Sequence, residues 1–199
     1  MKYGCSGTSG TSPIGKSQMM AFANKRAKHA ASEDELYEYA IRALGRKMRT
    51  VAELKRLLRN RVDAESSEGA QWIESVVSRL KEQRYLNDSE YAATYTRLRK
   101  ENDRLGKRRV QQDLMVKGVH ADVIAKTLDA GYSDARGNPE DEMKLARKFL
   151  ERKRIRKPND QKEAARIMRT LARAGYSTST IYKVLKQWDV EVDEEAMNE

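Results

Sequence analysis

Residues 85–128 read YLNDSEYAATYTRLRKENDRLGKRRVQQDLMVKGVHADVIAKTL, and the flanking sequence repeats the pattern of this stretch. Asn87 or Asp88 can cap a first helix, because a short acceptor side chain binds the free N–H groups at a helix start. Gly106 interrupts the pattern before a second helix, and Gly118 ends that helix because glycine tolerates left-handed backbone. Apolar residues at helical spacing then mark a third helix. The stretch therefore predicts a compact unit of three short helices.

The same three-helix pattern precedes and follows this unit. In the first unit, Gly45 is expected to end the helix that begins at residue 33. Thr50 and Glu53 then form the sequence signature of a capping box at the next helix start. The second and third units share the spacing L-x-x-x-G-x-x-x-x-x-I-x-x-x-L, which ends at Leu128 in one and at Leu185 in the other. In the first unit, Arg61 stands near the glycine position.

Together these features predict an all-α fold of three tandem three-helix repeats. Each unit is marginal alone, so we expect neighbouring units to pack end to end into an elongated, curved array. The predicted organisation is a flexible N-terminal extension at 1–32, repeats at 33–86, 87–137 and 138–188, and an acidic tail at 189–199.

The composition indicates an anionic partner, because the 199-residue chain carries a formal net charge of +10 and has a pI near 9.6. Aromatic residues make up only 7% of the chain, so thin layers of helices are favoured over one large core. No uncharged apolar run approaches the ~20 residues that span a bilayer. The single cysteine, Cys5, excludes an internal disulfide. We therefore expect a soluble, cytoplasmic monomer with no membrane partner.

One stretch near the N-terminus, Gly10–Ser17, matches the phosphate-loop pattern G-x-x-x-x-G-K-S. That loop binds phosphate only between a strand and a helix, where its backbone N–H groups converge. The preceding MKYGCSGTS does not have the apolar pattern expected of a strand. A chance match in a Gly/Ser-rich extension is the favoured interpretation, and a nucleotide-binding enzyme is the remote alternative.

The chain offers no catalytic constellation. The two histidines, His29 and His120, lie in the extension and at a helix–helix turn, and neither has the neighbouring Cys or second His of a metal site. We interpret His120 as a turn or cap residue. Asp113 is predicted to pair with Arg109, four residues before it. We expect no enzymatic activity, no metal and no cofactor.

Basic side chains crowd the helices of the second and third units. They could simply form a solvated helix face, but a local excess of basic over acidic residues recurs in each unit and favours an anion-facing stripe. Tyr37 and Tyr95 could stack on bases, although tyrosine at this period is more often part of a core. The predicted nucleic-acid or filament-binding residues are Arg97, Arg99, Lys100, Arg104, Lys107, Arg108, Arg109, Lys117, Lys148, Arg152 and Arg154.

Two motifs of the second unit resemble the RecX family, regulators of the RecA recombinase. Leu86–Ala92, LNDSEYA, is similar to the family's L-x-D-x-x-[FY]-A opening. Gly106–Val119, GKRRVQQDLMVKGV, is similar to its G-x-x-[KR]-[ILV]-x-x-[ED]-L-x-x-[KR]-G-[IV] core. The resemblance covers about residues 35–188, without the first 32 residues or the acidic tail.

The resemblance implies a non-enzymatic regulator of homologous recombination and the SOS response. Such a protein would bind the groove of the RecA–single-stranded DNA filament and hinder filament growth, strand exchange and co-protease activity. Its partners would be RecA and its nucleoprotein filament, with single-stranded DNA bound weakly. The alternative is a helix-turn-helix regulator of duplex DNA, because three-helix units also present recognition helices to major grooves.

Overall fold

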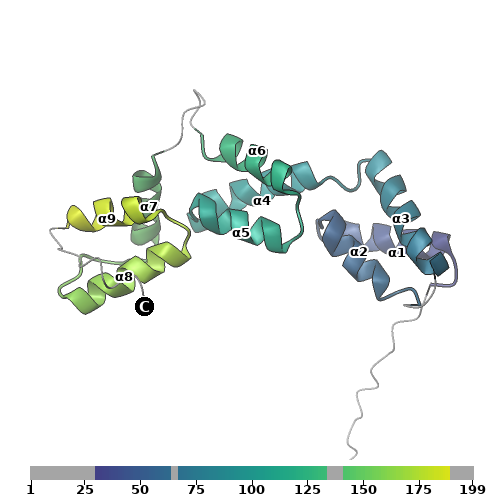
Figure 1. Ribbon diagram of the computed structural model, residues 1–199, viewed down its shortest axis with the longest axis horizontal. Coiled ribbons are helices and arrows are strands. Elements are labelled where there is room, and N and C mark those ends of the chain that lie inside the picture. The colour runs from purple at the N-terminus through teal and green to yellow at the C-terminus, as the bar shows by residue number, and fades with distance from the viewer. Residues whose placement is uncertain (1–29, 64–66, 134–140, 189–199) are drawn as a thin grey trace, which may run out of the picture.

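The computed structural model describes residues 30–63, 67–133 and 141–188, and this part of the chain forms nine α-helices without a strand. The Gly10–Ser17 motif, His29 and the acidic tail lie outside the described residues. The helices follow one another in three groups along an elongated molecule (Figure 1), which confirms the predicted all-α tandem array. The first group is α1 (Glu33–Arg46), α2 (Val51–Arg59) and α3 (Ser67–Glu82), the second α4 (Asp88–Asp103), α5 (Lys107–Val116) and α6 (Ala121–Gly131), and the third α7 (Glu142–Arg152), α8 (Gln161–Arg173) and α9 (Thr178–Lys186).

Local capping explains where most of these helices begin. Asn87 caps α4 by accepting from the N–H groups of Ser89 and Glu90, so Asn87 is the cap among the two predicted residues. Thr50 and Glu53 form the predicted capping box at the start of α2. One predicted stop is wrong. We expected α1 to end at Gly45, but α1 continues to Arg46 because Gly45 keeps helical backbone.

In each unit the first and third helices pack against each other, and the second helix packs mainly against the third. The first unit has its own apolar core, around the fully buried Leu36, Leu54 and Leu80. The second and third units share one continuous core, in which the ring of Phe149 meets Tyr176 edge-on at 5.8 Å. Each fully buried leucine contributes about 1.5–3 kcal/mol through burial of apolar surface. The second and third units therefore form one structural body with a shared core.

Neighbouring units meet at glycine turns that follow α5 and α8. Gly118 and Gly175 have φ angles of 75° and 89°, a conformation that favours glycine. Each also lies against the first turn of the preceding unit's second helix. A Cβ atom on Gly118 would lie 2.4 Å from the Cβ of Ala52, and one on Gly175 would lie 2.3 Å from the backbone nitrogen of Arg109. Only glycine both adopts the positive φ readily and leaves room for the neighbouring helix.

Hydrogen bonds complete both joints. At the joint between the first and second units, the Thr50 hydroxyl donates to the Lys117 carbonyl at 2.6 Å, and the Val51 N–H donates to Asp88 at 2.9 Å. At the joint between the second and third units, the Gly106 N–H donates to the Ala174 carbonyl at 2.8 Å. The C-terminal carbonyls of α5 and α8, which a helix leaves unpaired, thus find donors in the neighbouring unit.

The glycine joints predict that Gly175→Ala destabilises the protein strongly. The substitution adds left-handed strain of about 1–2 kcal/mol and also drives a Cβ into the backbone of Arg109. We expect a loss above about 2 kcal/mol in the free energy of unfolding, measured by chemical denaturation. Gly45→Ala is the control, because a Cβ there meets nothing within 4 Å in a helical segment. The control should be neutral or stabilised by up to about 1 kcal/mol. Equal effects of both substitutions would contradict this account of the joint.

Candidate nucleic-acid interface

A groove of about 410 Å³ lies at the joint between the second and third units. Its cationic side chains come from four helices: Arg99 from α4, Arg109 from α5, Arg152 and the adjoining Lys153 from α7, and Arg173 from α8. Two carboxylates, Asp103 and Asp113, line the same groove. Five cations against two anions leave a positive excess in a partly enclosed space, where electrostatic attraction is stronger than in open water. We call this the junction groove.

Asp103 organises the cations on one side of the junction groove. It accepts from Arg99 at 2.8 Å within the second unit and from Arg152 of the third unit at 3.3 Å. The hydrogen bond from Arg99 holds the pKa of Asp103 below its ordinary value, and the bond from Arg152 acts in the same direction. Asp103 is therefore ionised at neutral pH, and it ties the two units together while fixing two guanidinium groups.

Asp113 organises the cations on the other side of the junction groove. It pairs with Arg109 at 3.2 Å, which confirms the predicted ion pair, and it accepts from the Tyr95 hydroxyl at 3.1 Å. The ring of Tyr95 stacks on Tyr91 and lies 4.9 Å from the Arg99 guanidinium. Burial raises the pKa of the Tyr95 hydroxyl. Tyr95 thus supports the groove wall, and its proposed stacking on bases stays a prediction.

Two predicted residues, Arg104 and Arg154, share an unusual backbone conformation. Both follow the first helix of their unit, and their φ angles are 54° and 55°. Left-handed backbone costs a residue with a side chain about 1–2 kcal/mol. The Arg104 carbonyl accepts from the Tyr176 hydroxyl across the joint, so this conformation helps to join the units. Glycine would avoid this strain, so the presence of arginine at both positions points to a function of its side chain.

The remaining predicted residues are distributed over several surfaces. Lys117 lies in the first joint, paired with Glu53 at 3.0 Å, and its side chain is only 21% exposed. Lys107 pairs with Asp129 at 2.7 Å, and Lys100 donates to the Gly131 carbonyl at 2.7 Å. Arg97 pairs with Glu101 at 3.7 Å, while Arg108 and Lys148 are exposed. The structure thus brings Arg99, Arg109 and Arg152 together and leaves the others apart.

Sequence reasoning missed three members of the junction groove, Lys153, Arg173 and Asp103. Arg173 and Asp103 do not stand out in a local pattern, because their roles depend on how two units meet. The repeat did hold a signal: Arg173 comes two residues before the turn glycine Gly175, and this turn packs on the start of α5. Placing that turn against Arg109 would have located Arg173 near the groove.

The geometry can be compared with known proteins. A family model described as the second three-helix domain of RecX matches residues 87–128, and one described as its third three-helix domain matches residues 140–185. The regulatory protein RecX of Deinococcus radiodurans is 33% identical over 156 residues, which cover 77% of this chain and 68% of that relative. The chain belongs to the RecX family. The RecX of Leptothrix cholodnii is also 33% identical, over 61% of this chain and 71% of that relative.

Solved structures support the same fold. The crystal structure of RecX from Lactobacillus salivarius superposes with a TM-score of 0.59 at 20% identity, covering 79% of this chain and 96% of that chain. Another structure of a regulatory protein RecX gives a TM-score of 0.60 at 22% identity. As a RecX, the chain is a member of a family of regulatory proteins.

The described residues hold no group of three His, Cys, Asp or Glu side chains placed to bind a metal ion. His120 caps α6 by accepting from the Asp122 N–H at 3.4 Å, which confirms its interpretation as a cap. Within the same parts of the chain, none of the helices has the length and apolar character needed to cross a membrane.

The strained arginines give a prediction in which stability and binding move in opposite directions. Arg154→Gly relieves left-handed strain, so the free energy of unfolding should stay unchanged or rise by up to about 1 kcal/mol. Loss of the guanidinium should weaken binding to single-stranded DNA, measured by fluorescence anisotropy. Arg84→Gly is the matched control, because Arg84 also has a positive φ of 60° but follows α3 in the first unit. Equal loss of affinity in both variants would contradict a specific role for Arg154.

Proposed function

We propose that this RecX protein binds the RecA–single-stranded DNA filament and inhibits the recombinase, ATPase and co-protease activities of RecA. The observation that carries the proposal is the junction groove, where five cations face two carboxylates at the joint of two tandem units. Family membership supports the regulatory role and suggests the partner. Through this activity the protein would regulate homologous recombination and the SOS response.

An elongated array suits a filament because a filament offers the same surface repeatedly. Units in one chain reach several sites at once, and tethering raises the effective concentration of each further contact. Several weak contacts can then give tight binding. A chain that spans neighbouring RecA subunits would block growth at an end or hold together subunits that must move.

The cations suit contacts with phosphate rather than with base edges. A guanidinium can bind two phosphate oxygens, and such contacts do not distinguish one sequence from another. A helix-turn-helix role is less well supported at the second unit, where α6 would be the recognition helix. The exposed face of α6 carries Asp122 and Asp129 beside Lys126, so its charge does not favour a DNA major groove.

The salt dependence of DNA binding tests the junction groove. The double variant Lys153→Gln, Arg173→Gln removes two groove cations without breaking the Asp103 or Asp113 pairs. Affinity for single-stranded DNA should fall about equally for all sequences. The slope of log K against log salt should become shallower by about 1.4, since each phosphate contact on a single strand contributes about 0.7.

The matched control is Arg56→Gln, Arg59→Gln, which removes two exposed cations from α2 in the first unit. This control should change the slope much less. An unchanged slope in the groove variant would show that Lys153 and Arg173 do not contact DNA phosphates and belong only to the solvated surface.

Inhibition of RecA tests the proposal as a whole. We expect DNA-dependent ATP hydrolysis by RecA on single-stranded DNA to fall at well below one molecule of this protein per RecA protomer. The Lys153→Gln, Arg173→Gln variant should need more protein for the same inhibition. Point variants are preferable to removing the third unit, because that unit shares its core with the second. Inhibition that appears only when the protein exceeds the DNA sites would indicate simple competition for DNA.

A further inference from the structure

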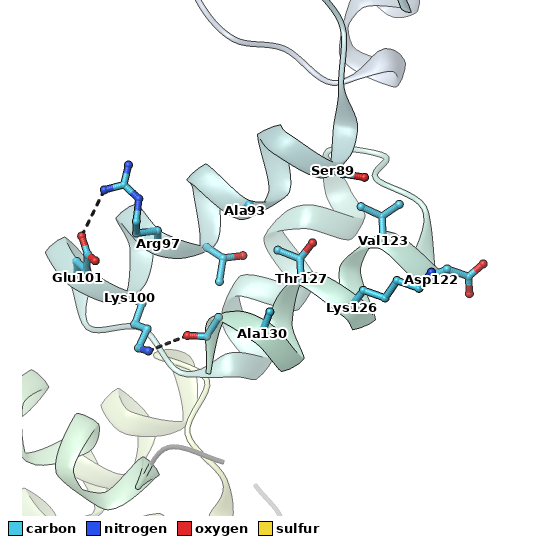
Figure 2. A pocket seen from close by; sticks show the side chains of 12 residues that line it. Ser89, Ala93, Arg97, Lys100, Glu101, Asp122, Val123, Lys126, Thr127 and Ala130 are labelled. Atoms are coloured by element: carbon cyan, nitrogen blue, oxygen red, sulfur yellow. Dashed lines mark hydrogen bonds and ion pairs between the residues drawn. The ribbon is translucent and has the colours of Figure 1, made fainter. Parts of the chain in front are cut away.

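A second groove, of about 680 Å³, lies between α4 and α6. Figure 2 shows Ala93 from α4 on one side and Val123, Thr127 and Ala130 from α6 on the other. These side chains are small or short, so the two helices leave space between them where larger residues would fill it. A pocket of this volume is in the range that accepts a small organic ligand.

Thr96 lines this groove and has an unsatisfied hydroxyl. The residue is 1% exposed, and its Oγ1 has no hydrogen-bond partner in the described part of the chain. Buried polar atoms of native proteins are nearly always paired, so an orphaned hydroxyl calls for an explanation. The oxygen is covered in the free protein, so the Thr96 side chain would rotate toward the groove when a ligand supplies the missing hydrogen bond.

Cationic side chains from both helices border the groove. Arg97 from α4 and Lys126 from α6 are exposed, and both line the groove. Lys100 marks one end, where it donates to the Gly131 carbonyl (Figure 2). Of the two carboxylates present, Glu101 already pairs with Arg97 at 3.7 Å. The groove thus has a mainly apolar lining with positive charge on either side.

We propose that the groove between α4 and α6 receives one base of single-stranded DNA. The apolar faces of the base pack on Ala93 and Ala130, the Thr96 hydroxyl bonds to the base edge, and the flanking phosphates lie near Arg97 and Lys126. This inference rests on the proposed function, since it names how the same DNA is held. An apolar side chain from a protein would leave the Thr96 hydroxyl unpaired, whereas every base carries hydrogen-bonding atoms on its edge.

The test compares a normal single-stranded oligonucleotide with one of the same length whose sugars carry no bases. Ala130→Leu fills the groove, and Ala125→Leu makes the same change on α6 outside it, at a residue that is also exposed. We expect Ala130→Leu to weaken binding of the normal strand about tenfold, the scale of one lost base contact. Binding of the abasic strand should stay unchanged, and Ala125→Leu should change neither.

Thr96→Val removes the hydroxyl at nearly constant shape. It should leave the protein at least as stable to denaturant, because an unpaired buried hydroxyl is lost, and it should weaken binding of the normal strand alone. Equal losses on normal and abasic strands, or no loss with Ala130→Leu, would overturn the base site. If Ala130→Leu spares DNA binding but weakens inhibition of RecA ATPase, a protein segment occupies the groove and the inference is wrong.

The two proposals fail in distinguishable ways. Absence of RecA inhibition by the unaltered protein would refute the proposed function. Normal inhibition together with a groove that tolerates leucine would refute only the base site. If the unaltered protein inhibits RecA without binding either oligonucleotide, the base site is also excluded and regulation acts through protein contacts.

Discussion

The structure depends on the close approach of two glycine turns to the helices of the preceding unit. The turn after the second helix lies against the first turn of the preceding unit's second helix, with Gly118 facing the Cβ of Ala52 and Gly175 facing the backbone nitrogen of Arg109. The last carbonyls of a helix need donors, and here Thr50 and Gly106 supply them from the neighbouring unit. The helix ends of one unit are therefore paired by its neighbour, and these close contacts at the two turns set the direction of the array.

The junction groove follows from the second of these joints. Contact with Gly175 holds the start of α5, which places Arg109 at the groove, and Asp103 at the end of α4 reaches across to Arg152. Because Asp103 and Asp113 already hold three of the arginines, less side-chain entropy is lost when an anion binds. A free arginine would lose up to about 2 kcal/mol in this way. Preorganisation of this kind favours affinity without adding contacts.

Local signals made much of the fold predictable. The Thr50 capping box and the Arg109–Asp113 pair both involve residues three or four positions apart, the range in which helical neighbours meet. The predicted end of α1 at Gly45 was wrong because glycine marks a helix end only where left-handed backbone is required. Contacts between units could not be read in this way. Arg152 lies 49 residues from Asp103, and no periodicity links them. Similarly, Lys117 looked like a surface cation, yet it is held by Glu53 in the first joint.

Comparison of the two joints shows how one of them acquired an excess of positive charge. Glu53 and Arg109 occupy the same place, three residues after the cap of the second helix, and Lys117 and Ala174 occupy the same place at the C-cap facing them. At the first joint, Glu53 and Lys117 neutralise each other in a largely buried pair. At the second, alanine and arginine occupy these two places, so this particular ion pair is absent, and Arg109 lines the groove paired with Asp113 of its own helix. The net charge of +10 indicates an anionic partner, and the difference at these two positions favours the second joint as the place where we propose that it binds.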